Sequence, residues 1–480
     1  MEAPATSSNG IGSNDIERQS QSSTMNQLDE CDRPVNWSFS KKWATVGSTS
    51  LATFVVSFGS SVYSAALAQI QARFGVSDDI ALLGVTFYLL GFAFGPMIWG
   101  PASELYGKRR PFLVGYALFC LLQLPCALAN SIWLLLTFRF LSSLAGSSTL
   151  AILGGMYVDF LTTPTERGIS TAIFSVVTFC GPTVGPVVGS VATAKLGWRW
   201  NAWLILIGGV VFGSLAFFLT PETSEAVILR QKARTRNTAN GSGLSEDNLE
   251  PSVSVFFRKY LTKPIKMFIG EPILVFFTIH MSIAYGVIYI TLTMYPLAFV
   301  TTRQWSPILG SLPFLGIVVG VVLACIVIAL HSIYYVTRRQ QETGTHLPER
   351  RLPPMIAGSV ILSAGIFWFA WTSNPSTPWP AQVSAGVFIG CGSILVLITG
   401  VVYLIEVYLT HANSALAFNN LVRSVVAATF PLYITDLLED AGLDIGGSVL
   451  GSICLALTLI AFLFWRFGQT IRLRSKFAYD

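Results

Sequence analysis

Three ionisable side chains lie inside long apolar stretches of this 480-residue sequence, where a charge is costly. Arg139 is the only charged residue in 111–158, and Glu406 is the only one in 352–422, a stretch that ends at Arg423. A glutamate can take up and release a proton, whereas an arginine stays charged and can only tune a carboxylate or bind an anion. We therefore expect Arg139, Glu406 and Arg423 to serve proton coupling. The alternative is that Glu406 and Arg423 form a static salt bridge between helix ends.

Other polar groups occur in the apolar stretches. His280 titrates near neutral pH in its unperturbed form, so we expect it to assist proton coupling; the alternative is a packed, hydrogen-bonded residue. Hydroxyl and amide side chains recur at steps of three or four residues, which places them on one face of a helix. Such faces favour a cavity for amphiphilic organic molecules, although Ser and Thr also bond their own helix or join two helices. The expected cavity residues are Ser57, Tyr285, Tyr289, Tyr403, Asn413 and Asn420.

The composition predicts the elements that must position these side chains. Hydrophobic residues make up 52% and charged residues 11% of the chain, against about 25% charged residues in soluble domains. A soluble globular fold is therefore excluded, and the apolar stretches are long enough for membrane-crossing helices of about 20 residues. The predicted fold class is an all-α membrane protein with twelve transmembrane helices in two six-helix halves. The expected spans are 45–68, 80–102, 111–129, 132–158, 169–193, 200–220, 272–299, 309–336, 353–373, 381–408, 413–435 and 446–467.

The polar segments predict the organisation of the chain. The longest interruption between spans is 221–271, which indicates a cytoplasmic linker between an N-terminal half, 43–220, and a C-terminal half, 272–467. Most Lys and Arg residues then lie on one side of the membrane, so both termini are expected in the cytoplasm as tails, 1–42 and 468–480. The N-terminal tail is rich in Ser, Asn and Gln, a disordered composition.

Several partner classes are not expected from these patterns. The basic residues flank the spans instead of forming one patch, so no nucleic-acid partner is predicted. The cysteines and histidines lack the spacing of ligands, so we expect no metal site and no cofactor. The scattered histidines also offer no catalytic constellation, so the chain is not expected to be an enzyme.

The loop between the second and third spans combines a Gly-bounded turn, an acidic residue at a helix end and a basic cluster. It contains Gly100, Glu104, Gly107, Lys108 and Arg109. This loop resembles the signature loop of the major facilitator superfamily, in the form found in its twelve-span fungal drug:proton antiporters. The resemblance implies that these five residues form a cytoplasmic gate.

Two further segments resemble motifs of the same family. Arg139–Gly146 in the fourth span is similar to the Arg-containing motif that the family associates with proton coupling. In the fifth span Gly and Pro recur, which permits close helix approach and a kink. This second segment resembles the motif typical of antiporters, with Gly181, Pro182, Gly185, Pro186 and Gly189. The chain departs from the family where Glu406 replaces Asp, Ser190 replaces Gly and Ala65 replaces Pro; the first change keeps the carboxylate, and the others can alter helix bending.

The resemblance implies a proton-coupled exporter of small amphiphilic organic molecules, such as drugs, toxins or secondary metabolites. Its two halves would rock around a cavity at the membrane midplane. An import or organelle carrier for a biosynthetic intermediate is the alternative. The expected partners are a small-molecule substrate, protons and the lipid bilayer, and the protein is expected as a monomer. We expect it in the plasma membrane, with an organelle membrane as the alternative.

Overall fold

Twelve apolar spans form the structure. The computed structural model describes residues 33–225, 227–232, 268, 270–336, 347–409, 412–473 and 475. Within these ranges, twelve helical segments are long and apolar enough to cross a membrane. The predicted number and order of spans are confirmed, but the first helical segment, Phe39–Phe74, is six residues longer at each end than expected.

The N-terminal half contains six spans, several of which consist of two helices joined end to end. Pro96 begins the second helix of one such pair directly after Gly95, where its missing N–H costs least. The longest helix begins with a capping box, in which the Thr163 hydroxyl accepts a hydrogen bond from the backbone N–H of Glu166. The helices are α2 (Phe39–Ser61), η3 (Val62–Ala66), α3 (Leu67–Phe74), α4 (Asp78–Phe94), α5 (Pro96–Tyr106), α6 (Arg109–Leu121), α7 (Gln123–Ala127), α8 (Ile132–Gly146), α9 (Ser148–Phe160), α10 (Pro164–Leu196) and α11 (Arg199–Leu219).

The C-terminal half also contains six spans. Proline begins many of its helices, as expected for a residue that has no backbone N–H to satisfy. The helices are α14 (Pro272–Tyr295), η5 (Pro296–Thr302), α15 (Pro307–Ser311), α16 (Phe314–Leu330), η6 (His331–Val336), η7 (Pro348–Arg351), α18 (Pro353–Trp371), α19 (Trp379–Val407), α20 (Ala412–Asp440) and α21 (Gly442–Arg472).

The distribution of apolar side chains is that of a membrane protein. Helices α11 and α21 expose large apolar side chains such as Phe218, which is 80% exposed, and Leu459, which is 66% exposed. Most hydroxyl-bearing side chains of α2 and α14 are buried instead. Lipid cannot accept or donate hydrogen bonds, so polar groups turn toward other helices and apolar groups turn outward.

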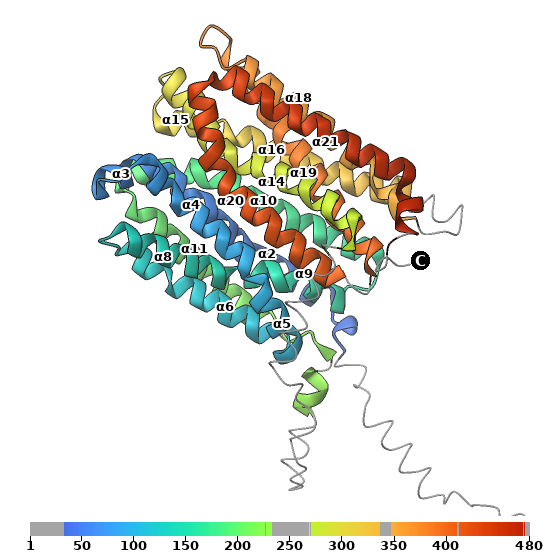
Figure 1. Ribbon diagram of the computed structural model, residues 1–480. Helices are drawn as coiled ribbons and strands as arrows, with labels where there is room; N and C mark the ends of the chain where they lie inside the picture. The colour runs from blue at the N-terminus through green and yellow to red at the C-terminus, as the bar shows by residue number, and fades with distance from the viewer. Residues whose placement is uncertain are drawn as a thin grey trace, which may run out of the picture.

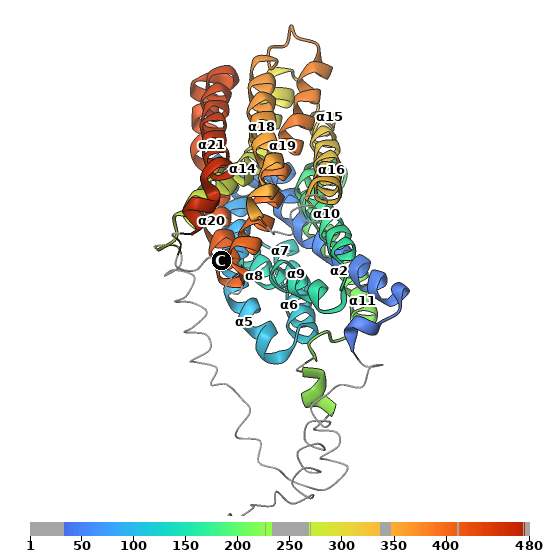
Figure 2. The same cartoon turned by 90° about the vertical axis from the view of Figure 1, so that its right-hand side faces the viewer.

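The two halves are separate bundles that meet along a few helices. Figure 1 shows the N-terminal half in blue to green and the C-terminal half in yellow to red, with α10 and α20 at their boundary. Helix α4 packs against α20, and α10 packs against α15 and α16. We call the end of the bundle where α2 begins and α21 ends the terminal end. The turns at α3 and α15 lie at the opposite end, and Figure 2 gives the same arrangement from the side.

Candidate functional site

Arg139 lies on α8 in the interior of the N-terminal half and is only 4% exposed. Its Nε donates to the carbonyl of Gly84 at 2.7 Å, and its Nη2 donates to the carbonyl of Gly59 at 3.2 Å. The guanidinium also lies over the rings of Tyr63 and Tyr88, at 4.2 and 4.8 Å from their centroids. In the described part of the chain it forms no ion pair with a carboxylate. Backbone carbonyls and aromatic faces of the first two spans therefore stabilise this buried cation.

Tyr285 and Tyr289 lie one turn apart on α14, where the C-terminal half meets the N-terminal half. Their hydroxyl oxygens are 3.3 Å apart, and the Tyr289 hydroxyl is 3.1 Å from the hydroxyl of Ser60 on α2. The ring of Phe179 on α10 packs edge-on against Tyr285, with 6.4 Å between centroids. The two predicted cavity tyrosines thus contact side chains of both α2 and α10 across the boundary.

Arg423, on α20, joins the same cluster. Its guanidinium carbon lies 4.9 Å from the ring centroid of Tyr285, and its Nη2 donates to Oδ1 of Asn420 at 2.8 Å. The Asn420 amide in turn donates to the carbonyl of Phe92 on α4 at 3.1 Å, across the boundary between the halves. Neither Glu406 nor another described carboxylate pairs with Arg423. The expected alternative of a static Glu406–Arg423 bridge is therefore wrong.

Glu406 lies at the terminal end of α19 and has a different basic partner. Arg351 donates from Nε to Oε1 of Glu406 at 2.9 Å and from Nη1 to the hydroxyl of Ser332 at 2.7 Å. The N-terminal half has a similar ion pair, in which Lys108 Nζ lies 2.6 Å from Asp159 at the end of α9. Neither Asp159 nor Arg351 was predicted as a site residue from the sequence. The repeat of six spans could have found them, because the fourth and tenth spans both end in a carboxylate near a basic loop.

The predicted gate loop folds around a second carboxylate, that of Glu222. This carboxylate accepts hydrogen bonds from the backbone N–H groups of Lys108 at 2.9 Å and Arg109 at 3.2 Å. An anion in this position stabilises the N-terminus of α6, where backbone N–H groups lack helical partners. Gly107 has a positive φ of 88°, and a Cβ there would meet the Glu222 carboxylate. Three of the predicted gate residues therefore gather around Glu222.

The other two predicted gate residues lie on α5, before the turn. Glu104 is exposed, and Gly100 has open space where a side chain would extend. No backbone conformation requires glycine at position 100, since its φ is not in the left-handed region. The structure thus gives a local physical reason for glycine at 107 but not at 100.

The motif glycines of α10 lie in direct contact with α2 and with η3, which continues it. A Cβ on Gly181 would lie 2.7 Å from the Cβ of Ser57, and one on Gly189 would lie 2.7 Å from the carbonyl oxygen of Val62. Gly185 faces the junction of α2 and η3, where a Cβ would meet the backbone nitrogen of Val62 at 2.8 Å. The two prolines of the motif lie within α10. Ser57, which we predicted in the cavity, is buried in this contact between α2 and α10.

Two other predicted site residues, His280 and Tyr403, are not part of the cluster between the halves. His280 is buried, and its Nε2 lies 2.9 Å from the hydroxyl of Ser359 on α18, inside the C-terminal half. Tyr403 is fully buried and stacks on Phe277 with 4.6 Å between centroids. The side chain of Asn413 lies outside the described residues. The hydrogen bond of His280 agrees with the structural alternative for this residue.

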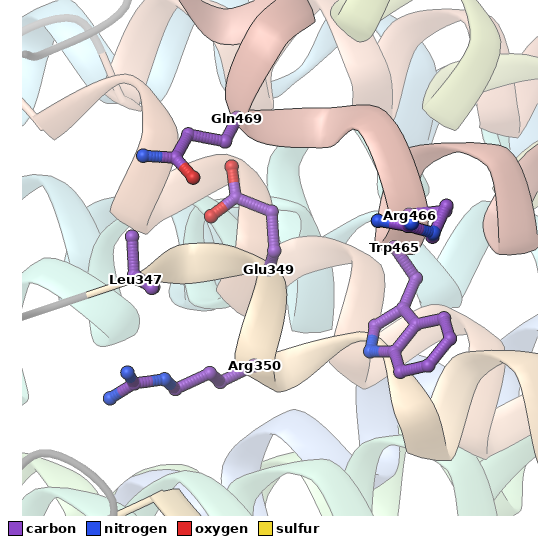
Figure 3. A pocket seen from close by; sticks show the side chains of 6 residues that line it. All are labelled: Leu347, Glu349, Arg350, Trp465, Arg466 and Gln469. Carbon is purple, nitrogen blue, oxygen red and sulfur yellow. The ribbon is translucent and has the colours of Figure 1, made fainter.

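Two cavities among the described residues lie near the ends of the C-terminal half. One, of about 390 Å³, lies at the terminal end between η7 and the last turns of α21. Figure 3 shows the carboxylate of Glu349 turned toward the amide of Gln469 in this cavity. The other, of about 810 Å³, is lined by residues of η5, α18 and the turn between α20 and α21 at the opposite end. Neither contains a predicted cavity residue, so the midplane substrate cavity stays a prediction. In the described residues, no group of three or more His, Cys, Asp or Glu side chains could hold a metal ion.

Two bundles of six spans that meet along polar side chains define the architecture of a secondary transporter. The comparison with known proteins gives the family. The sequence profile of the Major Facilitator Superfamily matches residues 49–431. The chain belongs to the major facilitator superfamily.

Relatives of the chain are fungal transporters. The chain is 41% identical over 453 residues to the citrinin biosynthesis cluster MFS transporter mrr1 of Monascus ruber, covering 93% of this chain and 90% of that protein. It is 38% identical to the ascochitine biosynthesis cluster MFS transporter of Didymella fabae, with coverages of 94% and 88%. It is 36% identical to the efflux pump FUBT of Fusarium oxysporum, with coverages of 91% and 74%. The chain is therefore a multi-pass membrane transporter and not an enzyme.

A solved structure supports the fold. The proton:xylose symporter XylE has a TM-score of 0.64 to this structure at 14% sequence identity, covering 90% of this chain and 96% of that chain. At this identity the likeness shows the fold alone. It confirms the predicted twelve-helix major facilitator fold in two halves.

Proposed function

We propose that this transporter exports small amphiphilic organic molecules in exchange for protons, across the plasma membrane. The names of its relatives support this proposal, because two belong to biosynthetic clusters of fungal metabolites and one is an efflux pump. The single observation that carries it is the cluster of Tyr285, Tyr289, Asn420 and Arg423, which contacts the N-terminal half at Ser60 and at α4. A ligand there would touch both halves at once, as alternating access requires.

The contacts between the halves are of a kind that can break and form again during transport. Besides the edge-on ring contact of Phe179 with Tyr285, they include four neutral hydrogen bonds, each with a net worth of about 1 kcal/mol. They join Asn420 to Phe92, Tyr289 to Ser60, Thr86 to the carbonyl of Ala428, and Ser190 to Ser311. The last bond is 2.8 Å long and lies toward the end opposite the terminal end. With the termini in the cytoplasm, these bonds favour a state closed on the outside and ready to open inward.

Glu406 is our candidate for the proton carrier. Protonation of its carboxylate would remove the ion pair with Arg351, which holds the end of α19 to η7. Proton binding would thereby loosen the terminal end of the C-terminal half. Arg139 cannot carry the proton, but it holds the first, second and fourth spans together through Gly59 and Gly84. Its role in coupling would be to set the arrangement of these spans.

The substitution Arg139→Ala tests the coupling. The variant should insert into the membrane, because its helix remains apolar, but it should lose transport driven by a pH gradient. The assay is flux of an amphiphilic dye in sealed vesicles that contain the purified protein, with the pH gradient imposed in either direction. The substitution Arg466→Ala, at an exposed position on α21, is the matched control. Proton-dependent flux by Arg139→Ala equal to that of the control would contradict the assignment. Dye movement in the same direction as the protons would contradict exchange.

A further inference from the structure

The two arginines that lie on inward-facing sides of α8 and α20 use their donors differently. Arg139 donates to two carbonyls of its own half and is 4% exposed. Arg423 has a hydrogen bond to one neutral amide, that of Asn420, and its buried Nε has no hydrogen-bond partner. An arginine carries five N–H donors in a planar fork, so most of the donors of Arg423 are available. Its side chain is also partly exposed, unlike that of Arg139.

No carboxylate of the described chain neutralises Arg423. The nearest acidic residue along α20 is Asp436, which is 13 residues away, or about 20 Å at 1.5 Å per residue. Glu406, at the end of α19, is bound to Arg351, and Asp159 in the other half is bound to Lys108. A cation in an apolar bundle without a counter-charge is unfavourable. An anion that enters the site would therefore supply the missing counter-charge.

We propose that Arg423, together with Tyr285 and Asn420, binds the carboxylate or a similar delocalised anionic group of an aromatic substrate. This inference rests on the proposed transport function and names the class of substrate that the site selects. The guanidinium fork matches the geometry of a carboxylate and can bind it with two parallel hydrogen bonds. Cationic molecules are excluded at this position because Arg423 repels them.

The surrounding side chains suit the rest of such a molecule. The ring of Tyr285 lies against Arg423, and the ring of Phe179 meets Tyr285 edge-on from the other half. Aromatic faces of this kind pack against a flat apolar ring system. The hydroxyl of Tyr289 lies next to the cluster and can turn its hydrogen from Ser60 or Tyr285 toward a further oxygen atom.

Anion binding would also act on the contact between the halves. Asn420 accepts from Arg423 through Oδ1 and donates to the carbonyl of Phe92 on α4 through Nδ2. An anion that takes the Nη2 donor of Arg423 removes the bond that orients the Asn420 amide. The bond to Phe92 then loses its support, so an anion that displaces the Asn420 amide from Arg423 favours separation of α20 from α4.

The test compares three probes of one shape and different charge: 2-naphthoate, 2-naphthamide and 2-naphthylmethylammonium. Their binding to the full-length protein in lipid nanodiscs is measured by equilibrium dialysis at pH 7. The wild-type protein should bind naphthoate at least about tenfold more tightly than naphthamide, and the ammonium probe most weakly. Arg423→Gln should weaken naphthoate binding by about 10- to 100-fold, the loss expected for charge-assisted hydrogen bonds. Naphthamide binding should change much less, which also shows that the variant is folded.

Two further variants sharpen the result. Arg423→Lys keeps the charge but not the fork, so it should keep part of the preference for the anion. Arg466→Gln removes a charge from the exposed surface of α21 and should bind all three probes like the wild type. Equal binding of naphthoate and naphthamide by the wild type, absence of naphthoate binding, or an unchanged preference in Arg423→Gln overturns the proposal.

The failure of this inference can be told apart from failure of the proposed function by measuring flux. If vesicles move neutral probes against a proton gradient and Arg423→Gln has no effect, transport stands and anion recognition falls. If naphthoate binds through Arg423 but no flux follows an imposed pH gradient, anion recognition stands and proton-driven export falls.

Discussion

Gly181 offers a direct test of the packing between α10 and α2. The substitution Gly181→Ala would place a Cβ 2.7 Å from the backbone nitrogen of Phe58 and from the Cβ of Ser57. Ordinary contacts begin at 3.4 Å, so the helices must separate by about 0.7 Å. The nearest atom includes backbone, which cannot rotate away as a long side chain can. Overpacking of this kind costs about 1–3 kcal/mol.

The matched control is Gly47→Ala on α2. A Cβ at Gly47 has nothing within 4 Å. Both substitutions gain the same helix propensity, about 0.5–1 kcal/mol, because alanine loses less conformational entropy than glycine on folding. This gain cancels when the two variants are compared. The difference between them is the packing cost alone, so Gly181→Ala should be less stable than Gly47→Ala by about 1–3 kcal/mol.

The assay is the midpoint of thermal unfolding of the purified proteins in detergent, followed by tryptophan fluorescence. Gly47→Ala should unfold at or above the wild-type temperature, and Gly181→Ala should unfold below it. Phe58 lies two residues before Ser60, which bonds Tyr289 of the other half, so transport by Gly181→Ala should also slow. Equal unfolding midpoints for the two variants would refute the close approach of α10 to α2.

Two other substitutions test the ends and the centre of the molecule. Glu406→Gln should flatten the dependence of transport on pH, because the neutral amide can neither release a proton nor form the ion pair with Arg351; a pH profile in vesicles that matches the wild type would exclude Glu406 as the proton carrier. Tyr289→Phe removes the hydroxyl that lies 3.1 Å from Ser60, so it should weaken the contact between the halves by about 1 kcal/mol. Increased labelling by thiol reagents of a cysteine placed at Ser64, one turn beyond Ser60 and outside this bond, would measure the effect in the Phe variant. Tyr285→Phe is the comparison, and unchanged labelling would show that the bond does not hold the halves together.

The local sequence was sufficient to predict the spans. A run of about 20 apolar residues must form a helix in lipid, because only a helix satisfies its backbone hydrogen bonds within one segment. The burial of polar stripes on α2 and α14 follows from the same rule, since a hydroxyl facing lipid would lack partners. The turn at Gly107 was also visible in the sequence, although its partner, Glu222, lies more than 100 residues further along the chain.

The partners of the polar residues could not be predicted from spacing alone. Helical periodicity says which residues share a face, but not which neighbouring helix that face meets. Ser57 shares a face with Ser60, yet the first packs against Gly181 of α10 and the second bonds Tyr289 of α14. A rotation of one helix by a fraction of a turn would exchange these partners.

The sequence by itself determined the membrane class, the twelve spans and the positions of the charged groups, because these depend on composition and on local backbone geometry. Only the tertiary structure decided that Glu406 pairs with Arg351 while Arg423 is left with Asn420 and the ring of Tyr285. The physical reason is that an ion pair requires atoms within 4 Å, and helix packing alone sets distances of that scale between residues far apart in the chain.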